Sequence, residues 1–235
     1  MLISLALKNS DCLVCSVPRA CWTELTGVAL KTLNLKLRST DDVILGSWFT
    51  FSEPFFRSKI RTGAANAAEA ESLIQDALKT HPTVLYLHGN AATRAVPTRV
   101  QTYSAFSSRM RVNVLTIDYR GFAESTGYPT ERGTINDGLS AIKWLVSQGA
   151  RPEDILVIGH SLGSGIATQS LEQAEREFGQ SFRGLVLMGG QASVHHQMET
   201  FLLGGIPVLR PVKLIPGGWG MCRTLHQMSS NHLCS

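Results

Sequence analysis

The feature of this chain that most clearly predicts chemistry is a serine between two glycines. Residues 155–158 are apolar, the pentapeptide Gly159-His160-Ser161-Leu162-Gly163 follows, and small residues able to open a helix come next. A turn from strand to helix this tight needs glycine at the flanking positions, and it lifts the serine hydroxyl above the carboxyl end of a sheet. We therefore predict that Ser161 is a nucleophile at such a turn and not part of a flexible loop.

From residue 83 onward, short apolar runs alternate with segments of helical length. The predicted strands are residues 83–87, 112–117, 154–158 and 184–188. Apolar residues recur at helical spacing between the second and third runs, which predicts a crossover helix over residues 132–148. Short buried strands joined by crossover helices form a mostly parallel sheet with helices on both faces. The predicted fold class is therefore α/β.

The segment before these strands has a different pattern. Residues 33–38 alternate between leucine and polar side chains, and after the turn residues 39–42 a second run, 43–51, alternates more loosely. Two such runs predict an antiparallel hairpin, which would form one edge of the sheet. Residues 66–79 are rich in Ala, Glu and Leu and are predicted to be a polar connecting helix or a mobile insertion.

The composition narrows the classes of function. A chain of 235 residues with 43% apolar and 17% charged residues is expected to form one soluble globular domain. The net charge is only +4 and no run of Lys or Arg occurs, so we expect no nucleic-acid partner. No uncharged apolar segment reaches the roughly 18–20 residues that span a bilayer. We expect a cytoplasmic location, or one peripheral to an intracellular membrane through apolar loops, because residues 1–7 do not resemble a signal peptide.

The cysteines predict neither a disulfide framework nor a metal site. The five cysteines are Cys12, Cys15, Cys21, Cys222 and Cys234. Their odd number and their positions near the two ends argue against paired bridges. Cys12 and Cys15 have the spacing of metal ligands, but no further cysteine pair or nearby histidine completes a zinc site.

Two further motifs precede the serine pentapeptide in a fixed order. His88-Gly89-Asn90-Ala91 follows the first predicted parallel strand, and residues 118–127, which begin Asp-Tyr-Arg-Gly, follow the next. With these three motifs, residues 30–216 resemble the α/β-hydrolase superfamily. More narrowly, they resemble abhydrolase-domain-containing lipases that act on monoacylglycerols and lysophospholipids. The resemblance implies hydrolysis of a small-molecule or lipid carboxylic ester through an acyl-enzyme at Ser161, with no cofactor and no metal.

The resemblance also implies roles for the residues around the serine. The backbone N–H groups of Asn90 and Leu162 are the expected oxyanion hole, which stabilises the charge that develops on the carbonyl oxygen. In this family the imidazole of the His-Gly motif shapes the loop and does not transfer protons. The residues expected to shape the site are His88, Gly89, Gly159 and Gly163.

Three nearby residues are given structural roles. In relatives the segment that begins at Asp118 is a turn that orders the loop beside the site, with Arg120 pairing locally. His160 is expected to point away from the cleft, because adjacent side chains of a strand face opposite sides. Ala123 stands where relatives usually carry glycine, a departure that is expected to matter little.

The partners that a serine nucleophile needs are not evident. Such a serine requires a histidine base and a carboxylate that orients it, in the chain order serine, acid, histidine. No Asp follows Ser161. The later carboxylates are Glu172, Glu175, Glu177 and Glu199, and the later histidines are His195, His196, His226 and His232. None of these histidines follows a predicted strand, so we predict no histidine–carboxylate pair within hydrogen-bond reach of Ser161.

The predicted organisation follows from these assignments. Residues 1–29 form an N-terminal extension, residues 30–216 a partial hydrolase domain, and residues 217–235 an atypical tail. Within the domain, residues 191–216 are either an apolar cap or a loop of the core. The C-terminal strands of a full domain are expected to be missing, so the chain is expected to be truncated relative to its relatives. The alternatives to an esterase are a catalytically incomplete or vestigial protein, with an interaction role or none, and a transferase or peptidase on this scaffold.

Overall fold

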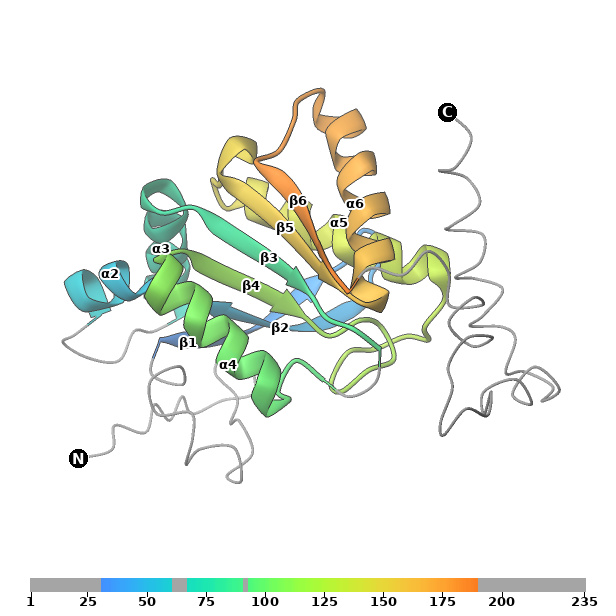
Figure 1. Cartoon of the computed structure of the whole chain (residues 1–235), viewed down its shortest axis with the longest axis horizontal. Coiled ribbons are helices and arrows are strands. Elements are labelled where there is room, and N and C mark those ends of the chain that lie inside the picture. The colour runs from blue at the N-terminus through green and yellow to red at the C-terminus, as the bar shows by residue number, and fades with distance from the viewer. Residues whose placement is uncertain (1–30, 61–66, 91–92, 190–235) are drawn as a thin grey trace, which may run out of the picture.

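The computed structural model describes residues 31–60, 67–90 and 93–189 (Figure 1). The strands are β1 (Thr32–Arg38), β2 (Ile44–Thr50), β3 (Thr83–Leu87), β4 (Asn113–Ile117), β5 (Ile155–His160) and β6 (Gly184–Met188). The helices are α2 (Glu53–Phe55), α3 (Ala67–Thr80), α4 (Pro97–Ala105), α5 (Glu131–Ser147) and α6 (Leu162–Phe178). Shorter helical turns cover Phe56–Ile60, Phe106–Met110 and Pro152–Asp154.

The described strands form one six-stranded sheet in the order β1-β2-β4-β3-β5-β6. Strand β1 pairs antiparallel with β2, and β2 pairs antiparallel with β4. The remaining strands, β4, β3, β5 and β6, are parallel. The predicted hairpin at the edge of a mostly parallel sheet is therefore confirmed, and so is the α/β fold class.

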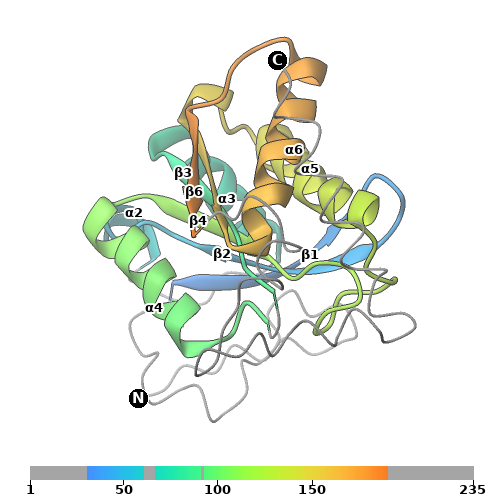
Figure 2. The same cartoon turned by 45° about the vertical axis from the view of Figure 1, so that its right-hand side comes forward.

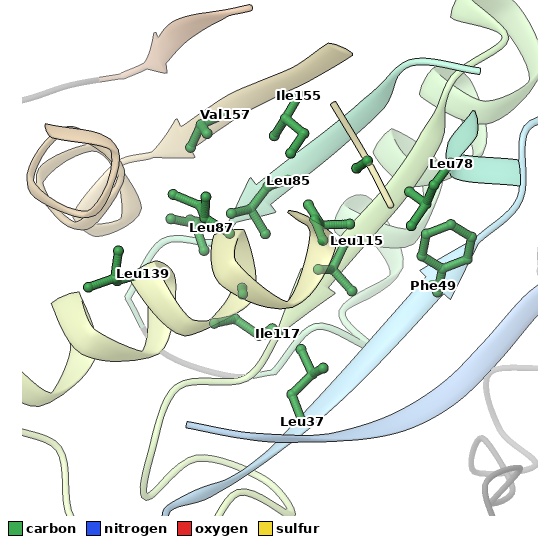
Figure 3. Packing of buried hydrophobic residues seen from close by; sticks show 14 of the residues in the cluster. Leu37, Phe49, Leu78, Leu85, Leu87, Leu115, Ile117, Leu139, Ile155 and Val157 are labelled. Atoms are coloured by element: carbon green, nitrogen blue, oxygen red, sulfur yellow. The ribbon is translucent and has the colours of Figure 1, made fainter. Parts of the chain in front are cut away.

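Helices cover both faces of this sheet, as predicted. Figure 2 shows α4 on one side of the sheet and α5 and α6 on the other. The larger apolar cluster joins the sheet to α3, α5 and α6, and its central members are drawn in Figure 3. The smaller cluster joins Val100 and Tyr103 of α4 to the opposite face. Because neighbouring strand residues face opposite sides, a strand covered on both faces is apolar along its whole length.

The ends of the helices follow local chemistry. The side chain of Thr130 accepts a hydrogen bond from the Gly133 N–H at 3.1 Å and so caps the start of α5. Pro97 occupies the first turn of α4, where its missing N–H costs nothing. Gly179 ends α6 with a φ of 64°, the left-handed conformation that glycine adopts readily.

The predicted elements agree closely with the observed ones. Residues 66–79 were predicted to be a helix or an insertion, and the structure has helix α3 there. The crossover helix predicted over 132–148 is α5. Strand β5 continues to His160, beyond the predicted end at residue 158, because Gly159 pairs with Leu87 and His160 pairs with Met188.

Several predictions concern residues outside those described. They are the N-terminal extension 1–29, the segment 191–216, the tail 217–235 and all five cysteines. Among the helices of the described ranges, none combines the length and the apolar character that crossing a membrane requires.

Ala123, which stands where relatives usually carry glycine, has a left-handed backbone. Its φ is 48°, a left-handed conformation that costs a residue with a Cβ about 1–2 kcal/mol. The side chain is exposed, so its removal loses no packing. We expect Ala123→Gly to raise the free energy of unfolding by about 0.5–1 kcal/mol, after the greater flexibility of glycine in the unfolded chain is subtracted. Urea denaturation followed by circular dichroism measures this change.

The matched control makes the same substitution in a helical conformation. Ala105 ends α4 with a φ of −62°. There Ala105→Gly is expected to lower the free energy of unfolding by about 0.5–1 kcal/mol. Equal destabilisation by both substitutions would show that the backbone of Ala123 is not strained.

Candidate active site

Ser161 is the single residue between the end of β5 and the start of α6, in the turn that the sequence predicts. Its φ of 52° and ψ of −116° place it in a sparsely populated region, at a cost of about 1–3 kcal/mol. The Ser161 N–H donates to the Met188 carbonyl oxygen at 2.9 Å, and the Ser161 carbonyl oxygen accepts from the Ser164 N–H at 2.9 Å. The surrounding backbone thus holds the strained turn, and the predicted position of Ser161 at a turn from strand to helix is confirmed.

The glycines of the pentapeptide let two pieces of backbone approach closely. A Cβ on Gly159 would lie 2.6 Å from the Ser164 Cα. A Cβ on Gly163 would lie 2.7 Å from the carbonyl carbon of Leu87 and 2.8 Å from the His88 carbonyl oxygen. Both positions therefore need glycine for the first turn of α6 to pack against the ends of β5 and β3.

The loop after β3 reaches the serine. A Cβ on Gly89 would lie 3.2 Å from the Ser161 Cβ, so this loop faces the turn as predicted. Asn90 follows Gly89 in that loop, and Leu162 opens α6 with a backbone N–H that has no acceptor inside the helix. Leu162 thus follows the serine in the chain, and Asn90 follows the glycine that packs against the serine; the role of their N–H groups as an oxyanion hole stays a prediction.

The imidazole of His160 packs against this loop, and its expected direction away from the cleft stays a prediction. Its Nδ1 atom is 3.1 Å from the position of a Cβ on Gly89. The reason is that β3 ends at Leu87, so the chain leaves the sheet at Gly89 and passes beside the end of β5. Within the described part of the chain, Nδ1 of His160 is buried and has no hydrogen-bond partner.

His88 is buried beneath the loop, with both ring nitrogens turned toward neighbouring groups. Its Nδ1 lies 2.8 Å from the Gly89 carbonyl oxygen, which can only accept, so Nδ1 carries a proton. Its Nε2 lies 3.3 Å from a carboxylate oxygen of Asp118. The Tyr119 hydroxyl donates to the His88 carbonyl oxygen at 2.8 Å. Burial raises the pKa of Tyr119 well above its ordinary value, so this donor stays protonated. The arrangement is suited to shaping the loop.

Asp118 joins the loops that follow β3 and β4. Its carboxylate is fully buried and accepts a hydrogen bond from the Arg94 N–H at 2.6 Å and another from the Arg94 guanidinium. The same guanidinium binds Glu124 and lies 5.0 Å from the ring centre of Trp48. Asp118 therefore holds a loop in place, in keeping with the turn-ordering role predicted for its segment.

The partners of Arg120 are not local, contrary to the expectation. Its guanidinium binds Asp137 of α5 at 2.7 Å and Asp41 of the β1–β2 turn at 2.7 Å. The hydrogen bonds from Arg120 hold the pKa of Asp41 well below its usual range. The contacts link elements that lie 17 and 79 residues apart from Arg120 in the sequence. Asp137 stands two residues after Ile135 and two before Leu139, so the helical repeat of apolar residues places it on another face and gives no sign that it is buried.

The part of the chain that the structure describes contains the histidines His81, His88 and His160. None of the three forms a hydrogen bond with the Ser161 hydroxyl; His81 precedes β3, at the opposite end of that strand from the serine. His195, His196, His226, His232 and Glu199 lie outside the described residues, so the predicted absence of a histidine–carboxylate pair stays a prediction. Over the described ranges, no group of three or more His, Cys, Asp or Glu side chains could hold a metal ion.

Two arginines beside the loop were not predicted from the sequence. Arg94 binds Asp118, as described above, and Arg99 of α4 donates to the carbonyl oxygens of Gly89, Asn90 and Thr93. The signal for Arg94 was available, because a buried carboxylate at the end of β4 needs a cation and β3 and β4 end at the same edge. Nothing local in the sequence distinguishes Arg99 from a solvated helix residue.

Comparison with known proteins agrees with the resemblance drawn from the motifs. Residues 82–213 match the family described as alpha/beta hydrolase fold. The lysophosphatidylserine lipase ABHD12 of Danio rerio is 39% identical over 137 residues, which cover 58% of this chain and 34% of that protein. The Rattus norvegicus ABHD12 is 39% identical over 150 residues, which cover 62% of this chain and 35% of that protein. The protein ABHD12B of Homo sapiens is 35% identical over 147 residues, covering 62% and 38%. The matched region thus spans about a third of the length of these curated relatives.

Solved structures show the same fold. An alpha-beta hydrolase from Vibrio vulnificus superposes with a TM-score of 0.58 at 18% identity, covering 89% of this chain and 65% of that one. The Pyrococcus furiosus esterase Pf2001 superposes with a TM-score of 0.55 at 17% identity, covering 89% and 64%.

Proposed function

The chain belongs to the α/β-hydrolase fold family, and we propose that it hydrolyses carboxylic esters through an acyl-enzyme formed on Ser161. The observation that carries the proposal is the left-handed Ser161 turn between β5 and α6, with Gly89 packed against it. This turn presents the hydroxyl at the carboxyl ends of the parallel strands, where open α/β sheets bind ligands.

The proposed reaction uses groups that the turn and the loop present together. The Ser161 oxygen attacks the ester carbonyl carbon, and its proton passes to a general base and then to the departing alcohol. The carbonyl oxygen becomes an anion that accepts hydrogen bonds from the N–H groups of Asn90 and Leu162, each worth on the order of 3–4 kcal/mol of barrier. Water then hydrolyses the acyl-enzyme. The proposal requires one of the later histidines, His195, His196, His226 or His232, as the base, against the expectation from the sequence that none of them reaches Ser161.

The proposed substrates are monoacylglycerols or lysophospholipids. Support comes from the relatives named lysophosphatidylserine lipases, which are 39% identical to the chain over 137 and 150 residues. We place the chain in the cytoplasm or at the surface of an intracellular membrane, where such lipids are accessible.

A second candidate is a catalytically incomplete protein that keeps the hydrolase fold. The observation that favours it is the lack, among the described residues, of any histidine hydrogen-bonded to the Ser161 hydroxyl. A serine without its base is a weak nucleophile, so such a chain would bind or interact without turnover.

Labelling with a fluorophosphonate probe separates the two candidates. The purified chain, shown to be folded by circular dichroism, is incubated with the probe alongside Ser161→Ala and the control Ser108→Ala, an exposed serine of the helical segment after α4. We expect the wild type and the control to be labelled and Ser161→Ala not to be. The wild type and Ser108→Ala should also hydrolyse p-nitrophenyl butyrate, and Ser161→Ala should not.

Two lipid arms then test the substrate class. Monoacylglycerol and lysophosphatidylserine are each supplied in mixed micelles, and fatty-acid release is measured. Release from either lipid that depends on Ser161 supports the proposal. A folded wild type that is neither labelled nor active would favour the incomplete protein.

A further inference from the structure

One side chain of α4 binds the backbone of the loop that carries Asn90. The guanidinium of Arg99, which is half-buried, donates to the Thr93 carbonyl oxygen at 2.7 Å, the Gly89 carbonyl oxygen at 3.1 Å and the Asn90 carbonyl oxygen at 3.3 Å. A guanidinium is planar and its donors are fixed in a fork, so three such bonds constrain the directions of three carbonyl groups at once.

The Gly89 carbonyl is held from two sides. Besides Arg99, it accepts a hydrogen bond from Nδ1 of His88 at 2.8 Å. A trans peptide is planar, and its N–H points opposite to its C=O. Whatever fixes the direction of the Gly89 carbonyl therefore also fixes the direction of the Asn90 N–H.

This peptide lies beside the nucleophile. The Gly89 Cα packs so close to Ser161 that a Cβ there would be 3.2 Å from the serine Cβ. We infer that Arg99 is a positioning residue that orients the Gly89–Asn90 peptide so that its N–H is presented to the oxyanion. The inference rests on the proposed function and deepens it.

Arg99 and Arg94 bind different groups in and around this loop. Arg94 binds the side chains of Asp118, Glu124 and Asn34, and so anchors the loop to its surroundings. Arg99 donates to three backbone carbonyls of this loop, and so sets the orientation of peptide groups. Loss of Arg94 should therefore affect mainly stability, and loss of Arg99 mainly the reaction.

Arg99→Met is the decisive variant, because it removes the donors and keeps much of the apolar stem. With p-nitrophenyl butyrate we expect kcat to fall about 10- to 100-fold while KM stays within about twofold, since the lost orientation matters only once the oxyanion forms. Arg99→Lys should recover part of kcat, because an ammonium group cannot bind all three carbonyls together. The control Arg109→Met, on the exposed surface of the same helical segment, should match the wild type.

A second measurement separates orientation from general damage. A trifluoromethyl ketone adds to the serine and forms an oxyanion adduct, so its inhibition constant should rise in Arg99→Met by the same factor by which kcat falls. Inhibition by the corresponding trifluoromethyl alcohol, which has no carbonyl group and forms no oxyanion, should be unchanged. Thermal melting of each variant reports on folding, and Arg99→Lys serves for the kinetics where Arg99→Met melts early.

The outcomes distinguish this inference from the proposed function. A wild type that turns over the ester, beside an Arg99→Met variant with equal kcat and equal ketone affinity, would overturn the role of Arg99 and leave the hydrolase proposal standing. A parallel loss of affinity for the ketone and for the corresponding alcohol would also overturn it. A folded wild type without Ser161-dependent turnover would overturn both proposals together.

Discussion

Replacing Gly163 by alanine is expected to lower the free energy of unfolding by at least about 3 kcal/mol. The new Cβ would lie 2.7 Å from the carbonyl carbon of Leu87 and 2.8 Å from the carbonyl oxygen of His88. These atoms belong to the backbone at the end of β3, which pairs with β4 on one side and β5 on the other. These backbone atoms cannot move without disrupting the pairing of β3 with its neighbours. The free-energy cost therefore exceeds that of overpacking against flexible side chains. Urea denaturation of the purified variant measures the loss.

Gly179→Ala is the matched control for this prediction. Nothing lies within 4 Å of a Cβ at Gly179, and its φ is 64°. The control therefore reports the backbone cost alone, about 1–2 kcal/mol. Gly163→Ala within about 1 kcal/mol of the wild type would mean that α6 does not pack against the end of β3 as the structure has it.

Most of the fold could be predicted because its signals are local. Strands β3, β4 and β5 are mostly apolar and buried, since helices cover both faces of the sheet there, and α5 has a helical repeat of apolar residues. Strand β1 alternates because one of its faces meets the core, whereas β2 is buried on both faces and alternates only loosely. Strand ends were less certain: β5 runs on through Gly159 and His160, where pairing with its neighbours continues after the apolar pattern stops.

The candidate site also contains features that the sequence predicts and features that it does not. The position of Ser161 could be predicted because a turn this tight requires glycine two residues before and two residues after the serine, and both glycines are visible in the sequence. The partners of Arg120 could not, because they come from the β1–β2 turn and from α5. The left-handed backbone of Ala123 was indicated only by the glycine that relatives usually carry there, since alanine itself gives no sign of a positive φ.

The ion pair between Asp118 and Arg94 is expected to be among the most costly contacts to break. Both side chains are buried, with exposed fractions of 0% and 5%. Asp118→Asn removes the charge at nearly constant shape and leaves the Arg94 guanidinium in the core with only the half-exposed Glu124 as an ionic partner. Removal of one partner of a buried pair typically costs about 3–5 kcal/mol, because the other charge stays desolvated and uncompensated. Urea denaturation gives the value for the variant.

A double-mutant cycle with Arg94→Met tests whether the charge pair is the cause. If it is, the double variant Arg94→Met with Asp118→Asn should lose at least about 1.5 kcal/mol less than the sum of the two single losses, because no unpaired charge remains. The exposed pair of Arg176 and Glu172 on α6 provides the comparison, and Glu172→Gln is expected to cost under about 0.5 kcal/mol. Additive losses at Asp118 and Arg94 would contradict the pairing. They would indicate that each residue holds its own loop independently, and that the Asn90 loop after β3 is not fixed to the loop after β4.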